Sequence, residues 1–346
     1  MATSAHQGLI LLALFTIYSC GTPLPYSGKT ASEKTSFAAA GFRLEGTITT
    51  PKKNPASGKM PGILLIAGTP GDRDWNASPL VINSGLILAR ALAVRGFITH
   101  RYDPPGRGKS TGKGKLTRDA AVNALLEAHR ILKRIKKCSP GQITWIAHGD
   151  AALTALTAST KQRPHRLILL CPPGMAMDQA LISQIQDALK RRGLNKNAVK
   201  NNLRYLKKGL RALYKDSPPA DAEDGIEPAL VHALRRLHAP GVREYSHWQL
   251  HNSPADKNLP APDLILMGEQ DVQYPPVRHK KPWIKAGVPT SRIHIIPDMD
   301  HMLKVQKDIL VSLLPGEILR SYTETSRPLS GVLLQKLTRV LQGHTP

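Results

Sequence analysis

One stretch near the middle of the chain constrains the fold more than any other. Residues 142–148 read as an apolar strand, Gly149 follows in a tight turn, and residues 151–156 continue as a helix of small and apolar side chains. Apolar runs at 63–67 and 97–102 are likewise followed by segments with helical spacing. Strands that alternate with helices in this way form a parallel sheet with helices on both faces. We therefore expect an α/β fold built on a mostly parallel, doubly wound sheet.

The remaining elements of the core follow from the same periodicity. Residues 41–50 alternate between apolar and polar side chains, as an edge strand of a hairpin does. Further elements are predicted at four ranges, with helices at 78–95 and 117–137 and strands at 166–170 and 262–267. With 346 residues, 41% of them hydrophobic, the chain can bury a large core. We expect the core domain to comprise residues 41–172 and 260–346.

The segment 173–259 lies between two predicted strands and differs from the core domain. Helical apolar spacing recurs in it at 177–192, 197–214 and 228–237, which predicts a helical cap inserted into the sheet domain. The whole chain carries 48 Lys and Arg residues against 25 Asp and Glu residues, a net charge of +23. Many of these cations lie in the cap, at Lys190, Arg191, Arg192, Lys196, Lys200, Arg204, Lys207, Lys208, Arg211 and Lys215.

This charge limits the classes of partner. The basic face of the cap is either a solvated helix surface or a site for anionic lipid or an anionic cell-envelope polymer. The sequence has no zinc-finger spacing, RNP pattern or basic leucine zipper, so no specific nucleic-acid partner is expected. The glycine- and lysine-rich run after residue 105 fails the Walker pattern because Asp103 stands where a glycine is required. We expect no cofactor.

The amino terminus indicates a location. Residues 8–17 form an apolar run suited to a signal peptide, and residues 17–20 resemble a bacterial lipobox that would make Cys20 the lipidated first residue. We expect a lipoprotein-type signal peptide over 1–20, a flexible tether over 21–40, and attachment to a membrane of the cell envelope, with Gly21 favouring the periplasmic side of the outer membrane. Because no Lys or Arg precedes the apolar run, a plain secretory signal or an uncleaved anchor is the alternative.

Two further cysteines, Cys138 and Cys171, are predicted to lie at opposite edges of the sheet. Cys138 precedes the strand at 142–148, whereas Cys171 ends the strand at 166–170. A disulfide requires Cα atoms within roughly 7 Å of each other. We therefore expect no bridge between these two residues.

Several motifs follow one another along the chain. In order they are the loop 67–74, the run 101–112, the strand and turn 264–273, and the loop 295–303. Together they resemble the motifs of secreted α/β-hydrolases of the carboxylesterase and serine-aminopeptidase type. The resemblance covers about residues 41–345 and implies the α/β-hydrolase fold. It also implies that residue 149 is the nucleophile position, that Asp271 is the triad acid, and that His301 is the triad base.

The chemistry of that family defines what the remaining residues would do. The base takes a proton from the nucleophile, the acid orients the base, and backbone N–H groups stabilise the oxyanion. The resemblance places those donors at Asp150 and in the loop around Thr69, with Gly68 and His148 beside them as binding residues. The sequence departs from the family at Trp75, Pro105 and Ala151-Ala152, and above all at Gly149, which has no attacking atom.

Two functions follow from this pattern. In the first, a hydrolase-fold protein binds a small-molecule or acyl ligand without turning it over. In the second, Asp271 and His301 activate water, or a cap side chain supplies the nucleophile, so that the chain remains a weak hydrolase. A nucleophilic Asp150 is a further alternative. It would require the turn that presents the nucleophile to shift by one residue, which would place His148 where a small residue is needed. His294, Asp298, Asp300 and His301 could also form a metal site, but the expected triad role of their loop argues against metal.

Overall fold

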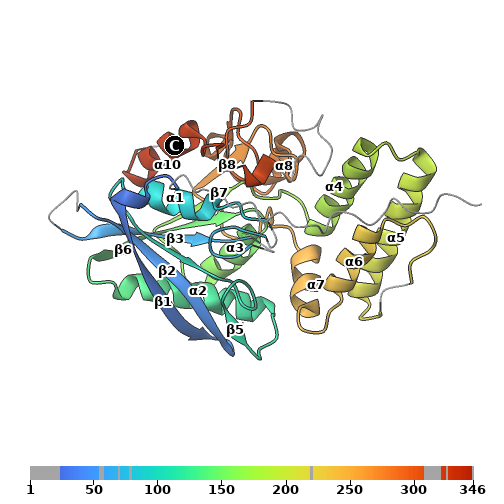
Figure 1. Ribbon diagram of the computed structural model, residues 1–346, viewed down its shortest axis with the longest axis horizontal. Coiled ribbons are helices and arrows are strands. Elements are labelled where there is room, and N and C mark those ends of the chain that lie inside the picture. Colours follow the sequence, from blue (N-terminus) through green and yellow to red (C-terminus); the bar gives the residue numbers. More distant parts are fainter. Residues whose placement is uncertain are drawn as a thin grey trace, which may run out of the picture.

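The computed structural model describes residues 24–53, 58–68, 71–77, 80–218, 221–307, 321–324 and 326–344. These residues form a nine-stranded sheet with helices on both faces and a group of helices beyond one edge (Figure 1). The strand order is β1-β2-β4-β3-β6-β7-β8-β9, and β5 pairs with β2. The predicted α/β class with a mostly parallel sheet is confirmed.

The central strands run parallel to one another. They are β3 (Met60–Ile66), β4 (Ile98–Tyr102), β6 (Cys138–His148), β7 (Arg166–Leu170), β8 (Leu264–Gly268) and β9 (Ile293–Ile296). Most of their side chains are buried, because a sheet covered on both faces needs apolar residues at consecutive positions. Their carboxyl ends meet at one edge of the sheet, which is where open α/β sheets bind ligands.

The amino-terminal part of the sheet differs from the prediction. β1 (Thr30–Ala39) pairs antiparallel with β2 (Phe42–Pro51), and the short β5 (Thr111–Gly112) also pairs with β2. The expectation of a flexible tether over 21–40 is therefore wrong for residues 30–39, and β1 rather than β2 is the edge strand. Most side chains of β1 are exposed, so its sequence lacks the apolar alternation of a strand, and backbone pairing with β2 supplies its contacts.

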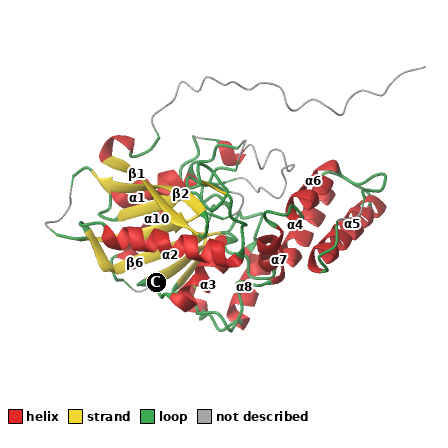
Figure 2. Ribbon diagram, turned by 90° about the horizontal axis from the view of Figure 1, so that it is seen from below, coloured by secondary structure: helices red, strands yellow, loops and turns green. Residues whose placement is uncertain are grey.

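Two hydrophobic clusters fill the space on either side of the sheet. One face is covered by α1 (Ser84–Ala93) and α10 (Gly331–Leu341). The other face is covered by α2 (Arg118–Arg134), α3 (Ala151–Lys161) and α8 (Pro276–Lys285), and Figure 2 shows α2 lying along it. Helix α1 begins at residue 84 rather than 78, because Oδ1 of Asn76 accepts hydrogen bonds from the backbone N–H groups of Ile82 and Asn83 and holds them in a turn.

The segment between β7 and β8 forms a separate group of helices at the edge of the sheet domain (Figure 1). It contains α4 (Met177–Arg191), α5 (Lys196–Tyr214), α6 (Pro228–Leu237) and α7 (Arg243–His251). The first three match the predicted helices of the cap within one residue, whereas α7 was not predicted. The cap has its own hydrophobic cluster, formed by leucines of α5, α6 and α7 around Leu206, Leu234 and Leu250.

The predicted signal peptide and Cys20 lie outside the described residues. None of the helices that the structure describes combines the length and apolar character needed to cross a bilayer. Cys138 and Cys171 are both buried and free. Burial raises the pKa of the Cys138 thiol to about 11 and that of the Cys171 thiol well above its usual value, so both thiols are protonated at neutral pH.

Candidate active site

Gly149 occupies the sharp turn between β6 and α3, at the carboxyl edge of the sheet. Its φ is +59°, a left-handed conformation that glycine adopts without steric cost. Its backbone N–H donates to the carbonyl oxygen of Leu170 at 2.9 Å, which fixes the turn against β7. A Cβ atom at residue 149 would lie 3.5 Å from Nε2 of His301 and 3.9 Å from a ring carbon of Tyr274. A side chain at this position would therefore face the imidazole without a clash.

His301 and Asp271 form the hydrogen-bonded pair that the sequence predicted. Nδ1 of His301 lies 2.9 Å from Oδ2 of Asp271, and both side chains are buried. The other oxygen, Oδ1, accepts hydrogen bonds of 2.8 Å from the backbone N–H groups of Gln273 and Tyr274. Burial alone would raise the pKa of Asp271, but the charge of His301 and these hydrogen bonds hold it below its usual value. The carboxylate therefore stays ionised, and Nε2 of His301 remains directed toward Gly149.

His148 supports the loop that carries His301. Its Nε2–H donates to the carbonyl oxygen of His301 at 2.8 Å, and its ring stacks on Trp75 with centroids 4.5 Å apart. Burial, with a smaller effect from the charge of His301, lowers the pKa of His148 to about 3, so the ring is neutral. Trp75, one of the departures from the family motif, keeps a φ of +65° and forms a wall of the site.

Asp150 begins α3 and places its carboxylate over the start of the 68–77 loop. Oδ2 accepts a hydrogen bond from Nε2 of Gln249 on α7, so the cap reaches the site through this contact. Oδ1 lies close to Gly68, because a Cβ atom on Gly68 would come within 2.3 Å of it. The carboxylate thus lies beside the region where the resemblance expects oxyanion donors. Thr69, the other predicted donor position, lies outside the described residues.

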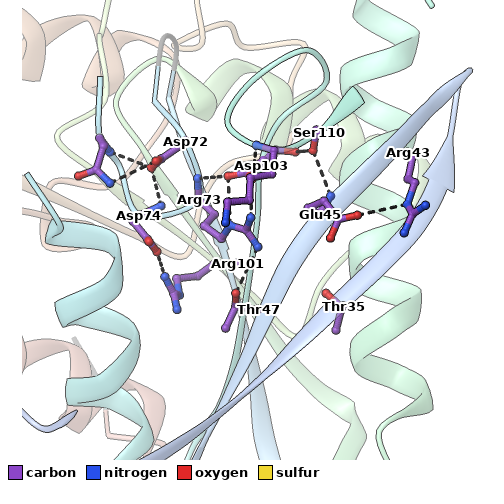
Figure 3. A network of polar contacts seen from close by, with 12 residues as sticks. Thr35, Arg43, Glu45, Thr47, Asp72, Arg73, Asp74, Arg101, Asp103 and Ser110 are labelled. Atoms are coloured by element: carbon purple, nitrogen blue, oxygen red, sulfur yellow. Dashed lines mark hydrogen bonds and ion pairs between the residues drawn. The ribbon is translucent and has the colours of Figure 1, made fainter. Parts of the chain in front are cut away.

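The loop that follows β3 is held by a network of charged side chains (Figure 3). The carboxylate of Asp103 accepts hydrogen bonds from the guanidinium and the backbone N–H of Arg73, and from the backbone N–H of Lys109. Asp74 pairs with Arg101, which is only 2% exposed. These contacts join the loop to β4 and to the run after it, so the motifs at 67–74 and 101–112 are two halves of one structural unit.

A cavity of about 260 Å³ opens beside Gly149, among the loops that follow β3, β6, β8 and β9. Its wall is mostly apolar and aromatic, with a few polar groups grouped around Gly149. The lining residues are Gly68, Gly71, Trp75, Ala77, Leu80, Ile82, His148, Gly149, Asp150, Gln273, Tyr274, His301, Met302 and Tyr322. Apolar walls with a few convergent polar groups are typical of small-molecule sites.

Three residues of the site were missed by the sequence analysis. Tyr274 packs edge-on against His301 with ring centroids 5.2 Å apart, and Tyr322 also lines the cavity. Gln249 reaches Asp150 from the cap. Tyr274 could have been proposed because it follows Asp271 by three residues, whereas Tyr322 and Gln249 lie in segments that carry no family motif.

In the part of the chain that the structure describes, the alternative metal ligands His294, Asp298, Asp300 and His301 do not form a group with metal-ligand spacing. The carboxylate of Asp300 instead binds the guanidinium of Arg327 at 2.6 Å and accepts a hydrogen bond from the backbone N–H of Lys304. Among the described residues, the grouping with metal-ligand spacing is Cys171, Asp271 and His301. In that grouping Asp271 orients His301, with Oδ2 2.9 Å from Nδ1.

Known structures share this architecture. Brefeldin A esterase, described as a bacterial homologue of human hormone-sensitive lipase, is 13% identical, with a TM-score of 0.50 over 91% of this chain and 76% of its own. An esterase from Pyrococcus furiosus is also 13% identical, with a TM-score of 0.50 over 88% of this chain and 94% of its own. The esterase rPPE is 14% identical with the same TM-score over 93% and 85%. At such identities the likeness concerns the fold alone.

No curated protein has a sequence that matches this chain. A family model described as the alpha/beta hydrolase family matches residues 63–304, which include strands β4 to β9, the turn at Gly149, the cap and the loops of Asp271 and His301. The chain therefore belongs to the alpha/beta hydrolase family.

Proposed function

We propose that this chain binds a small, mostly apolar ligand in the cavity beside Gly149 and forms no covalent intermediate with it. The carrying observation is the geometry of residue 149, where a glycine occupies the position that faces Nε2 of His301. Covalent catalysis in this family needs an attacking side chain there, and glycine has none. The ancestry is that of an esterase- or peptidase-like hydrolase, and the chain retains the ligand pocket.

The lining of the cavity indicates the class of ligand. Its aromatic and aliphatic walls suit an acyl chain or a small aromatic group. The amide of Gln273 can donate or accept hydrogen bonds, and the carboxylate of Asp150 can accept them. A negative charge at Asp150 disfavours a free carboxylate next to Gly68. We therefore expect a neutral ester, amide or alcohol to bind more tightly than the corresponding free acid.

The first test compares hydrolysis of short-chain aryl esters by the native chain, Gly149→Ser, and Gly149→Ser with His301→Ala. The proposal expects no turnover by the native chain, measurable turnover by Gly149→Ser, and loss of that turnover when His301 is also replaced. Calorimetry with a non-hydrolysable ether analogue then measures whether the pocket of the native chain binds such a ligand. Native turnover that disappears in His301→Ala would refute the non-catalytic function.

A second candidate is a hydrolase that uses water in place of the missing side chain. The intact pair of His301 and Asp271 favours it. Nε2 of His301 would take a proton from water as the water oxygen bonds to the carbonyl carbon. The tetrahedral intermediate would then expel the alcohol oxygen, which takes the proton from His301. This mechanism predicts native turnover without an acyl-enzyme burst, and equal loss of activity in His301→Ala and Asp271→Ala would support it.

The location in the cell forms part of the proposal. A lipidated Cys20 would tether the hydrolase domain to a membrane of the cell envelope. Fractionation of cells that express the full chain should find it with the membranes, and the Cys20→Ala variant should leave them. An unchanged distribution of the variant would contradict lipid attachment at this residue and favour the uncleaved anchor.

A further inference from the structure

Helix α5 carries a stripe of positive charge with little countercharge. Its cations recur at Lys196, Lys200, Arg204, Lys207, Lys208 and Arg211, and the helix contains no Asp or Glu. Residues three or four positions apart on a helix are neighbours, and like charges at this spacing destabilise it. Several of these cations stand four residues apart, so the helix accepts repeated repulsion along one face. A bound anion would remove that repulsion.

The stripe borders a groove rather than a flat surface. A groove of about 760 Å³ runs between the carboxyl-terminal half of α4 and the length of α5. Leu194, Val199 and Leu203 give it a carbon floor. The cations stand around this floor at Lys190, Lys196, Lys200, Arg204, Lys207, Lys208 and Arg211. Lysine and arginine side chains can cover an apolar surface with their methylene groups while their charged ends reach outward.

Acidic partners within the chain do not account for these cations. Among the described residues, Arg204 pairs with Glu223 at 2.8 Å, and the other six groove cations pair with no acidic side chain. Other basic residues of the cap do have acidic partners, since Arg192 binds Glu227 and Arg243 binds Asp216. Cations of the cap outside the groove, such as Lys215 and Lys257, also have no acidic partner among the described residues. The groove differs because its six unpaired cations surround one apolar floor.

We propose that this groove binds an anionic lipid at a membrane surface, with an acyl chain on the carbon floor and the head-group phosphate among the rim cations. Both views place α5 at the end of the cap farthest from the sheet, where a membrane can reach it (Figure 1, Figure 2). Nucleic acid fits less well. Single strands need aromatic side chains for base stacking, whereas Tyr205, the aromatic residue of this part of α5, is buried in the cap core.

The test measures binding of the full chain to vesicles of phosphatidylcholine with and without phosphatidylglycerol. The amino terminus can contribute to binding of both vesicle types, and the difference between the two affinities removes that contribution. The groove variant combines Lys200→Gln, Lys207→Gln and Lys208→Gln. The control combines Lys215→Gln, Arg235→Gln and Lys257→Gln, which removes the same charge from exposed positions of the cap outside the groove.

Each cation near an anionic membrane surface contributes roughly fivefold to affinity, so the groove variant should bind phosphatidylglycerol vesicles about 100-fold more weakly. The affinity of the control variant for these vesicles should fall much less. Circular dichroism should find both variants folded, because every substituted side chain is exposed. Equal losses in the two variants would overturn the proposal in favour of a general basic surface.

A second variant tests the carbon floor. Leu194→Ser should weaken binding to the phosphatidylglycerol vesicles while leaving binding to heparin unchanged, because heparin has no acyl chain. If Leu194→Ser has no effect on the vesicles, and heparin or single-stranded DNA binds the groove as tightly as the vesicles do, the groove is a polyanion site and the lipid proposal is wrong. The activity of the cavity beside Gly149 enters none of these measurements, so this proposal stands or falls independently of the proposed function.

Discussion

A Cβ atom on Gly149 would lie 3.5 Å from Nε2 of His301, at ordinary van der Waals distance. The site therefore has room for the nucleophilic side chain that the family places there, and that side chain is missing because residue 149 is glycine. Because the left-handed φ of +59° is the remaining obstacle to a side chain, glycine at this position favours folding while it excludes covalent catalysis.

Gly149→Ala should accordingly destabilise the fold without disturbing the packing. We expect its free energy of unfolding to fall by about 1–2 kcal/mol, the cost of a left-handed conformation for a residue with a Cβ atom. Urea unfolding followed by circular dichroism measures this change. Gly141→Ala is the matched control, because Gly141 of β6 lies in open space without a left-handed φ, and it should change stability by less than about 0.5 kcal/mol. Equal effects of the two substitutions would contradict the assigned strain.

Asp150→Asn should increase the activity created by Gly149→Ser. The carboxylate lies against Gly68, where its negative charge opposes an oxyanion that forms on the substrate. The amide has nearly the same shape and removes the charge, so kcat for aryl ester hydrolysis should rise by about tenfold or more over Gly149→Ser alone. A lower kcat in the double variant would mean that Asp150 assists the reaction instead.

Asp103→Asn should lower the concentration of denaturant at which the chain unfolds. Its carboxylate is 1% exposed and accepts charged and backbone hydrogen bonds from Arg73, so the substitution leaves a partly buried guanidinium without its countercharge. We expect a loss of about 3 kcal/mol, as for other broken buried ion pairs. Asp119→Asn, whose partners Arg118 and Lys161 are exposed, is the control and should cost less than about 0.5 kcal/mol. Similar losses in both variants would exclude a special role for the network.

His129 should make the fold sensitive to acid. Its Nδ1 accepts a hydrogen bond from the indole N–H of Trp145 at 2.9 Å, which requires the neutral ring. Burial, followed by the charges of Lys133 and Arg130, lowers its pKa to about 4. Between about pH 6.5 and 4 the unfolded chain therefore binds a proton that the native chain does not, and stability falls as pH falls.

His129→Gln keeps an acceptor for Trp145 and removes this titration. Between pH 7 and pH 5 the variant should lose about 1–2 kcal/mol less stability than the native chain. Guanidinium unfolding at the two pH values provides the measurement. His232→Gln, at an exposed position of α6, should follow the native profile. If His129→Gln also follows it, the ring is not held neutral in the fold.

The core elements were predictable because their stability depends on local patterns. The apolar runs of β3, β6, β7 and β8 and the helical spacing of α2, α4, α5 and α6 identify buried faces directly. β1 escaped prediction because it buries few side chains and depends on backbone pairing with β2. α7 escaped because its residues mix charged, aromatic and polar side chains without a clear apolar stripe.

The sequence by itself determined the family resemblance, the loss of the attacking atom at Gly149, and the residues Asp271 and His301 at the ends of two strands. Only the tertiary structure decided that His148 is stacked on Trp75 and kept neutral, and that the carboxylate of Asp150 is bound by Gln249 of the cap. The physical reason is that the features found from the sequence depend on residue type and on position along a strand or turn. The features found from the structure depend on desolvation and on contacts between segments that are far apart in the chain, which no local pattern encodes.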